Sequence, residues 1–264
     1  MVTAPLVRYS EGMQLAFVLT NSAGLPEANA IADAYAEVTP HGGRPIVWDG
    51  GGGDQDQRAL SVGAASVVMA AMPAPVPEGE ADEASHLSLS ALGTGWTLPE
   101  HRFHIVVAAT NLDEESAVPM RCDFTRLVAA VSRACGAVGI YWGEASATHE
   151  PAFFFETTRD AELPIALWTG VSVARDGAER VSLLSLGMGQ FGMEDLLLTG
   201  PIGEAGVAIE MFFDLLAYAV RRGTQVQPGE TVGRTDEERI EVSESESPID
   251  PEARVWRVDL PDES

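Results

Sequence analysis

Two stretches of the chain follow the same order of expected elements, and this order limits the folds that the chain can adopt. Apolar runs such as QLAFVLT and FHIVVAA predict buried strands, and apolar residues at helical spacing follow each of them. The first stretch predicts a strand at 14–20, a helix at 26–38 and a strand at 45–48, and the second predicts a strand at 103–109, a helix at 123–136 and a strand at 138–142. The pattern indicates a βαβ half that occurs twice, although chance and shared fold geometry explain it about as well.

The remaining segments predict further strands and helices. We expect a long strand at 60–72, a loop at 78–100, a short helix near 149–158, hairpin strands at 165–174 and 180–187, a long helix at 203–221, a solvated loop at 243–247 and a last strand at 253–260. The long helix is apolar nearly all round, with Glu210, Asp214 and Arg221 as a narrow polar stripe.

Together these elements predict an α+β fold with mixed or antiparallel sheets and helices on one face. Duplicated ferredoxin-like halves are one form of this fold. We expect a single domain over residues 1–264, and two pseudo-repeated halves at about 1–100 and 101–264 that share a core are the alternative division.

The charge of the chain excludes several classes of protein. Its 40 acidic and 16 basic side chains give a net charge of −24, and every basic residue is an arginine. Without lysine there is no P-loop lysine on a phosphate and no Schiff base to a carbonyl group. The acidity also argues against nucleic acid as a partner, because phosphate binding depends on clustered lysine and arginine. The charge fits recognition of a basic partner, or a solvated surface suited to solubility or a salty cytoplasm.

The sequence predicts a cytoplasmic protein with reduced thiols. Residues 1–10 lack the apolar core of a secretory signal, and the longest apolar run, at 63–76, is too short to span a bilayer. Cys122 and Cys135 flank an expected helix of about 20 Å, too long for a disulfide between its ends. We therefore expect no membrane association.

The segment Trp142–Glu156 is the most suitable place for a catalytic or ligand site. Glu144, His149 and Glu150 lie close together in the sequence, and carboxylates around a histidine are candidates for perturbed pKa values. A small-ligand-binding or hydrolytic enzyme with its site here is our alternative function. No second histidine follows His149 at the spacing of a zinc protease, so we expect no metal site. No catalytic motif is complete, and we assign no catalytic residue and no cofactor.

Residues 187–192 (GMGQFG) form a literal GxGxxG motif. A dinucleotide site needs this motif in a parallel βαβ unit, with a helix directly after the glycines. Here the preceding strand is the second arm of a hairpin, and Gly200-Pro201 interrupts the segment that follows. We therefore interpret the motif as a tight turn.

An acidic run near the C-terminus supplies the candidate residues for binding a partner. Asp236, Glu237 and Glu238 begin this run, and a solvated face is its other interpretation. Because no group of residues meets the geometric roles of a catalytic site, our leading hypothesis is a non-enzymatic interaction protein. Such a protein, of the adaptor or immunity type, would use its acidic surface to bind another, basic protein.

Several segments together resemble a known family. They are MPAPVP (72–77), HRFHIVV (101–107), FTRLVAAV (124–131), VGIYWG (138–143), LPIALWTGVSV (163–173), GMGQFGMEDL (187–196) and GETVGRTDEERIEV (229–242). In this order they resemble a bacterial family, the domain-of-unknown-function family 4261, over most of the chain. The resemblance implies an architecture and no mechanism, because the family carries no established activity. It also implies that GMGQFG is a structural turn.

Overall fold

The computed structural model describes residues 13–49, 56–63, 65–77, 79–110, 117–235 and 238–262. Contacts between Cα atoms divide the chain into two compact units, Met1–Trp168 and Thr169–Ser264. The boundary between the two units thus lies after residue 168, whereas the sequence predicts the alternative halves at about 1–100 and 101–264. A single domain with a shared core stays a prediction.

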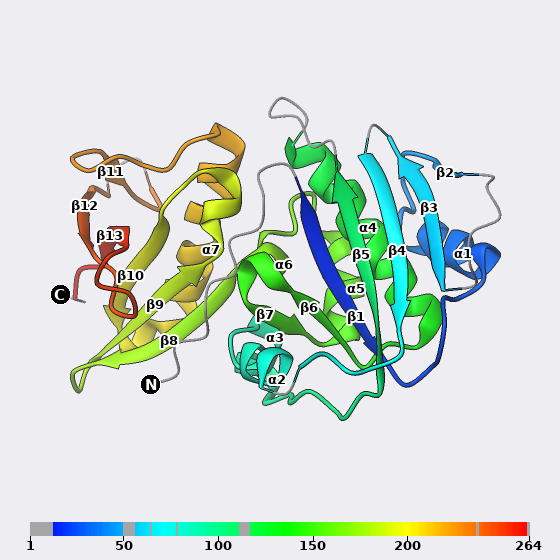
Figure 1. Ribbon diagram of the computed structural model, residues 1–264. Helices are drawn as coiled ribbons and strands as arrows, with labels where there is room; N and C mark the ends of the chain where they lie inside the picture. Colours follow the sequence, from blue (N-terminus) through cyan, green and yellow to red (C-terminus); the bar gives the residue numbers. More distant parts are fainter. Residues whose placement is uncertain are drawn as a thin grey trace. The chain divides into compact units, whose positions relative to one another are not determined.

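The first unit is built on one antiparallel sheet with the strand order β2-β3-β4-β5-β1-β6-β7 (Figure 1). Its strands are β1 (Gln14–Thr20), β2 (Ile46–Trp48), β3 (Gln57–Val62), β4 (Ala65–Met72), β5 (Phe103–Thr110), β6 (Gly139–Trp142) and β7 (Ala147–His149). Its helices are α1 (Ala28–Val38), α2 (Glu80–Ser85), α3 (Leu89–Thr94), α4 (Ala117–Cys135), α5 (Pro151–Asp160) and α6 (Ile165–Trp168).

The middle of this sheet has a ferredoxin-like arrangement. In chain order, β1, α1, β4, β5, α4 and β6 follow the β-α-β-β-α-β pattern, and their strands are adjacent as β4-β5-β1-β6. The two stretches that the sequence predicts as a repeat contribute β1-α1 and β5-α4-β6 to this one arrangement. Residues 46–48 instead form the edge strand β2, and β4 completes the first half.

One face of the sheet packs against helices α1, α4 and α5 (Figure 1). Ala16 lies between Val107 and Trp142 in the register of the central strands, and all three side chains are buried. Phe124 of α4 meets the Trp142 ring edge-on, with the ring centroids 5.6 Å apart. The apolar stripe predicted for α4 therefore covers the centre of the sheet.

Helix α2 is an addition on the other face. Ala81 and Ala84 of α2 form a buried cluster with Leu19 of β1 and Tyr141 of β6. Residues opposite one another in an antiparallel ladder share a face, and Tyr141 pairs with Phe17, which packs against the same cluster. The predicted α+β class is confirmed, with helices mainly on one face of this sheet.

The second unit combines a sheet with one long helix. Its sheet has the order β11-β12-β13-β10-β9-β8, and all of its pairs are antiparallel except that of β10 with β13. Its elements are β8 (Gly170–Asp176), β9 (Arg180–Leu186), β10 (Asp195–Pro201), α7 (Ala205–Arg222), β11 (Thr231–Val232), β12 (Ile240–Glu246) and β13 (Arg254–Asp259). Helix α7 packs on β10 and β9, and buries Ala208, Phe212 and Leu216.

Several local predictions are wrong. The run 60–72 is not one strand, because β3 and β4 form a hairpin around Gly63, whose φ of 61° is readily available to glycine. The predicted loop at 78–100 contains α2 and α3, and residues 165–168 form α6 before β8 begins. Residues 243–246 belong to β12.

Candidate functional site

Glu144, the first residue of the predicted ligand site, lies in a 3-10 turn directly after β6. Its Oε2 accepts a hydrogen bond from Nη1 of Arg121 at 3.0 Å, and the two side chains are only 12% and 6% exposed. Burial raises the pKa of Glu144, and the guanidinium of Arg121 opposes this shift. With its amide oxygen turned toward Arg121, Gln14 accepts a further hydrogen bond from Nε at 2.9 Å. Glu144 is thus part of a buried ion pair.

His149, the second predicted residue, is completely buried at the end of β7. Its Nε2 lies 3.0 Å from the carbonyl oxygen of Leu167, and its Nδ1 lies 2.8 Å from the hydroxyl of Ser88. A carbonyl oxygen only accepts, so Nε2 carries the proton and the Ser88 hydroxyl donates to Nδ1. Burial lowers the pKa of His149 to about 4, so the ring is neutral at pH 7.

The hydrogen bonds continue from Ser88 toward α5. Ser88 Oγ lies 2.8 Å from Ser90 Oγ, and Ser90 Oγ accepts from the backbone N–H of Glu150 at 3.4 Å. Since Ser88 donates to His149, Ser90 donates to Ser88, and the direction of the whole chain is fixed. Glu150 therefore enters this network through its backbone, as the residue that precedes the first turn of α5.

The three predicted residues have separate partners. Glu144 pairs with Arg121, His149 is held by a serine and a carbonyl, and Glu150 contributes an amide. Within the part of the chain that the structure describes, no group of three or more histidine, cysteine, aspartate or glutamate side chains could hold a metal ion. A catalytic or ligand site at Trp142–Glu156 stays a prediction.

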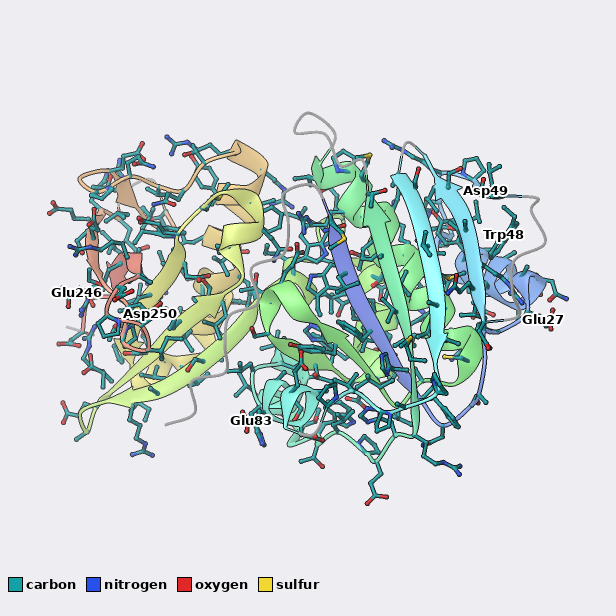
Figure 2. All side chains as sticks on the ribbon, in the orientation of Figure 1. Glu27, Trp48, Asp49, Glu83, Glu246 and Asp250 are labelled. Atoms are coloured by element: carbon teal, nitrogen blue, oxygen red, sulfur yellow. The ribbon has the colours of Figure 1, made fainter. Side chains whose placement is uncertain are left out.

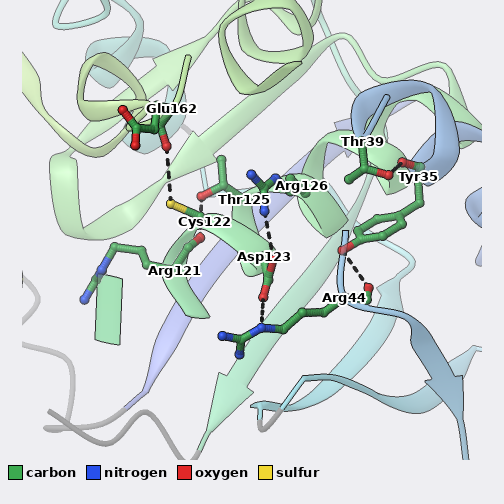
Figure 3. Close-up of polar contacts among 9 residues, drawn as sticks. All are labelled: Tyr35, Thr39, Arg44, Arg121, Cys122, Asp123, Thr125, Arg126 and Glu162. Atoms are coloured by element: carbon green, nitrogen blue, oxygen red, sulfur yellow. Dashed lines mark hydrogen bonds and ion pairs between the residues drawn. The ribbon is translucent and has the colours of Figure 1, made fainter. Parts of the chain in front are cut away.

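A second buried polar group connects α1 with α4 (Figure 3). Asp123 is buried and accepts from Nη1 of Arg126 at 2.9 Å, while its other oxygen lies 3.2 Å from Nε of Arg44. The Tyr35 hydroxyl donates to the carbonyl oxygen of Arg44 at 3.0 Å. Burial, reinforced by the negative charge of Asp123, raises the pKa of Tyr35 to about 12. These contacts indicate a structural role, because the charge of Asp123 is paired with those of Arg44 and Arg126.

The GxGxxG motif is the connection between β9 and β10. Residues Met188–Phe191 form a single 3-10 turn, and the two strands are antiparallel. The half-buried carboxylate of Asp195 accepts from the Ser185 hydroxyl at 2.8 Å and from the Met188 N–H at 3.1 Å. Burial raises the pKa of Asp195 to about 6. The motif thus lacks the parallel βαβ setting of a dinucleotide site.

Of the predicted partner-binding residues, only Glu238 lies among the described residues. Its carboxylate pairs with Arg234, with Oε1 3.1 Å from Nη2, and it also accepts from the backbone N–H of Arg234. These hydrogen bonds lower the pKa of Glu238. Asp236 and Glu237 lie outside the described residues.

The second unit has an open groove of about 760 Å³ between α7 and residues 226–235 and 239, which we call the α7 groove. A cavity of this size falls in the range of ligand sites, about 300–1,000 Å³. Met211, Leu215 and Val226 are buried and form an apolar floor. Glu210, Asp214 and Tyr218, all exposed, stand on the α7 side and follow one another at intervals of four residues.

Some of the charged side chains around the α7 groove form ion pairs, and others do not. Arg222 binds the Glu230 carboxylate at 3.1 Å, and Arg234 binds Glu238, so both of these guanidinium groups are compensated. No hydrogen bond or ion pair involves the carboxylates of Glu210 and Asp214 among the described residues. The α7 side therefore carries two uncompensated negative charges above an apolar floor.

The sequence indicates one side of this groove and not the other. Glu210 and Asp214 are visible in it as a polar stripe on an apolar helix. The opposite side, residues 226–235 and 239, has no helical or strand pattern that would place it along α7. The sequence therefore indicates the acidic run at 236–238 and gives no sign that Glu210 and Asp214 line a groove.

The second unit is a sheet-and-helix unit with an open groove beside its one long helix. Residues 184–259 match the model of a family described as "Domain of unknown function (DUF4261)". The resemblance to this family is confirmed over that segment, which runs from β9 to the end of β13 and includes both sides of the α7 groove. The resembling segments before residue 184 lie outside the match.

Other comparisons add no further relative. Neither a curated protein nor a solved structure matches the chain. Among the described residues, no helix has the length and apolar character needed to cross a membrane.

Proposed function

We propose that this chain is a non-enzymatic interaction protein of the cytoplasm that binds a basic partner protein through an acidic surface, as an adaptor or immunity protein does. The net charge of −24 and the absence of lysine support a cationic partner and argue against nucleic acid. Further acidic side chains, such as those of Glu246 and Asp250, lie on the second unit outside the α7 groove (Figure 2), and they add to the negative field without lining the proposed binding site. A field of this sign accelerates the encounter with a positive surface.

The α7 groove is the observation that carries this proposal. Most of the ion pairs among the described residues are on the surface, where each contributes little, whereas Glu210 and Asp214 keep their charges available. An apolar floor beside these carboxylates offers the combination of buried area and charge that protein interfaces use. The groove lies entirely within the segment that matches the family.

The proposal is tested with the tagged full chain and a lysate of its own host at low and high salt, with bound proteins identified by mass spectrometry. A stoichiometric basic partner is then purified, and its affinity is measured by calorimetry. We expect weaker binding at high salt, since screening shortens the range of surface charges to a few ångströms at about 1 M.

Two variants locate the interaction. Glu210→Gln with Asp214→Asn removes the uncompensated charges, and reversal of charge at Asp236, Glu237 and Glu238 changes the acidic run. Glu246→Gln with Glu252→Gln is the matched control, because it removes two exposed charges of the same unit away from the groove. A stable complex that is insensitive to salt and to both sets of changes would contradict an electrostatic interaction.

A further inference from the structure

We infer that the α7 groove binds an extended basic segment of the partner whose cationic side chains occupy alternate positions. This inference rests on the proposed function and specifies what the site recognises. Glu210 and Asp214 are exposed, uncompensated and one helical turn apart on the same side of the groove. The arginines at 222 and 234 are already paired with carboxylates, and Arg239, the third arginine of the lining, donates to a backbone carbonyl oxygen. Two carboxylates therefore face one guanidinium, and the charge left for an occupant to neutralise is negative.

The spacing of these groups matches an extended chain. Four residues of α-helix advance about 6 Å along the helix axis. Glu210 and Asp214 are separated by this distance, and so are Asp214 and Tyr218. Two residues of extended chain advance about 6.6 Å, and their side chains point to the same side. Cationic side chains at positions i and i+2 thus reach Glu210 and Asp214 together. The side chain at i+4 reaches Tyr218, which is 51% exposed and offers its ring face to a cation or an aliphatic group.

The opposite side of the groove also favours an extended occupant. Thr231 and Val232 of β11 line the groove, and β11 is the terminal strand of its sheet. A terminal strand leaves one row of backbone N–H and C=O groups unused by its own sheet. An extended peptide can pair with such an edge, whereas a helix has already used its own backbone groups.

The floor suits the stems of basic side chains. Met211, Leu215 and Val226 are buried and line the same groove as Glu210 and Asp214. Arginine and lysine place their methylene stems on apolar surface while the charged ends remain at the rim. The geometry therefore selects a basic segment with alternating cationic residues over an acidic or purely apolar one.

Fluorescence anisotropy with labelled synthetic peptides tests this inference on the full chain. One peptide carries Arg-Ala-Arg-Ala-Leu, and its control has the same composition as Ala-Ala-Arg-Arg-Leu. We expect the alternating peptide to bind about fivefold more tightly, and we expect Glu210→Gln with Asp214→Asn to remove this preference. The control variant Glu246→Gln with Glu252→Gln retains it. Thermal melts of each variant confirm that the chain is folded.

The contradicting outcomes separate this inference from the proposed function. Salt-sensitive binding of both peptides with equal affinity, unchanged in the Glu210/Asp214 variant, would overturn the groove and leave an acidic binding surface intact. If neither peptide binds at low salt, the result contradicts both the binding site in the groove and the proposal of a basic partner. Dimerisation of the chain that the same substitutions abolish would assign the groove to a second copy and overturn the inference.

Discussion

The hydroxyl of Ser88 donates a hydrogen bond to Nδ1 of His149 across 61 residues of sequence, at 2.8 Å and out of contact with solvent. Because Nε2 of the same ring donates to Leu167, the imidazole joins the start of α3 to β7 and α6 in its neutral form. The same bond would activate a serine nucleophile if solvent and substrate could reach it. In this fold it holds three elements together.

The neutral state of His149 predicts a loss of stability in mild acid. Its pKa is about 4 in the folded chain and 6.5 as a model value, so the unfolded chain binds more protons between these limits. Stability therefore falls as the pH falls from 6.5 to about 4, by up to about 1.4 kcal/mol per pH unit. His149→Gln should cost about 1–3 kcal/mol at pH 7 through its lost hydrogen bonds. In urea unfolding, the difference in free energy of unfolding between the native chain and His149→Gln should be smaller at pH 5 than at pH 7. An equal difference at both pH values would contradict the buried neutral ring.

Asp195 predicts the opposite dependence on pH. Its pKa is raised to about 6 from 3.8, so the folded chain binds more protons between these values, and stability falls as the pH rises through that window. In Asp195→Asn the amide oxygen still accepts from Met188, and the variant lacks the charge that burial penalises. Thermal melts should show Asp195→Asn gaining stability relative to the native chain from pH 4 to pH 7. The exposed Asp214→Asn serves as control, and an equal trend in both would refute this prediction.

The buried pair of Arg121 and Glu144 predicts a non-additive response to substitution. Arg121→Met leaves the Glu144 carboxylate buried without its partner, which costs about 3–5 kcal/mol. Arg121→Met with Glu144→Leu removes both charges, so we expect the double variant to be more stable than the single one. Chemical denaturation of the two variants and of Glu144→Leu completes the cycle. Additive losses would show that the two side chains are not coupled.

The elements that the sequence predicts well are those whose pattern is local. The stripe on α4, the long helix α7 and the hairpin of β8 and β9 depend on spacing within a few residues, and the structure confirms each of them. The hairpin at Gly63 is missed because the apolar character of 60–72 continues through the turn. A single glycine in such a run gives little indication of a reversal.

The candidate sites depend on contacts that no local pattern contains. His149 resembles a ligand in the sequence because its partners Ser88 and Leu167 are distant along the chain. Glu238 resembles a free charge because no pattern in the sequence indicates that its carboxylate pairs with Arg234. The α7 groove exists because the fold places the apolar helix α7 beside residues 226–235, which have no helical pattern in the sequence. Composition predicts the sign of the surface, and only the fold shows which carboxylates remain unpaired.

Partial burial of Cys122 and Cys135 predicts that both thiols react slowly in the folded chain. Both cysteines are free, and burial raises the pKa of each thiol to about 11. At pH 8 roughly one thiol in a thousand is then a thiolate, which is the form that reacts with alkylating reagents. Iodoacetamide should modify the native chain at least about 100-fold more slowly than the chain in urea, as followed by intact mass spectrometry. Ser243→Cys places an exposed thiol on β12 and should react rapidly in the same sample. Equal rates for all three thiols would contradict the protection of Cys122 and Cys135 by partial burial.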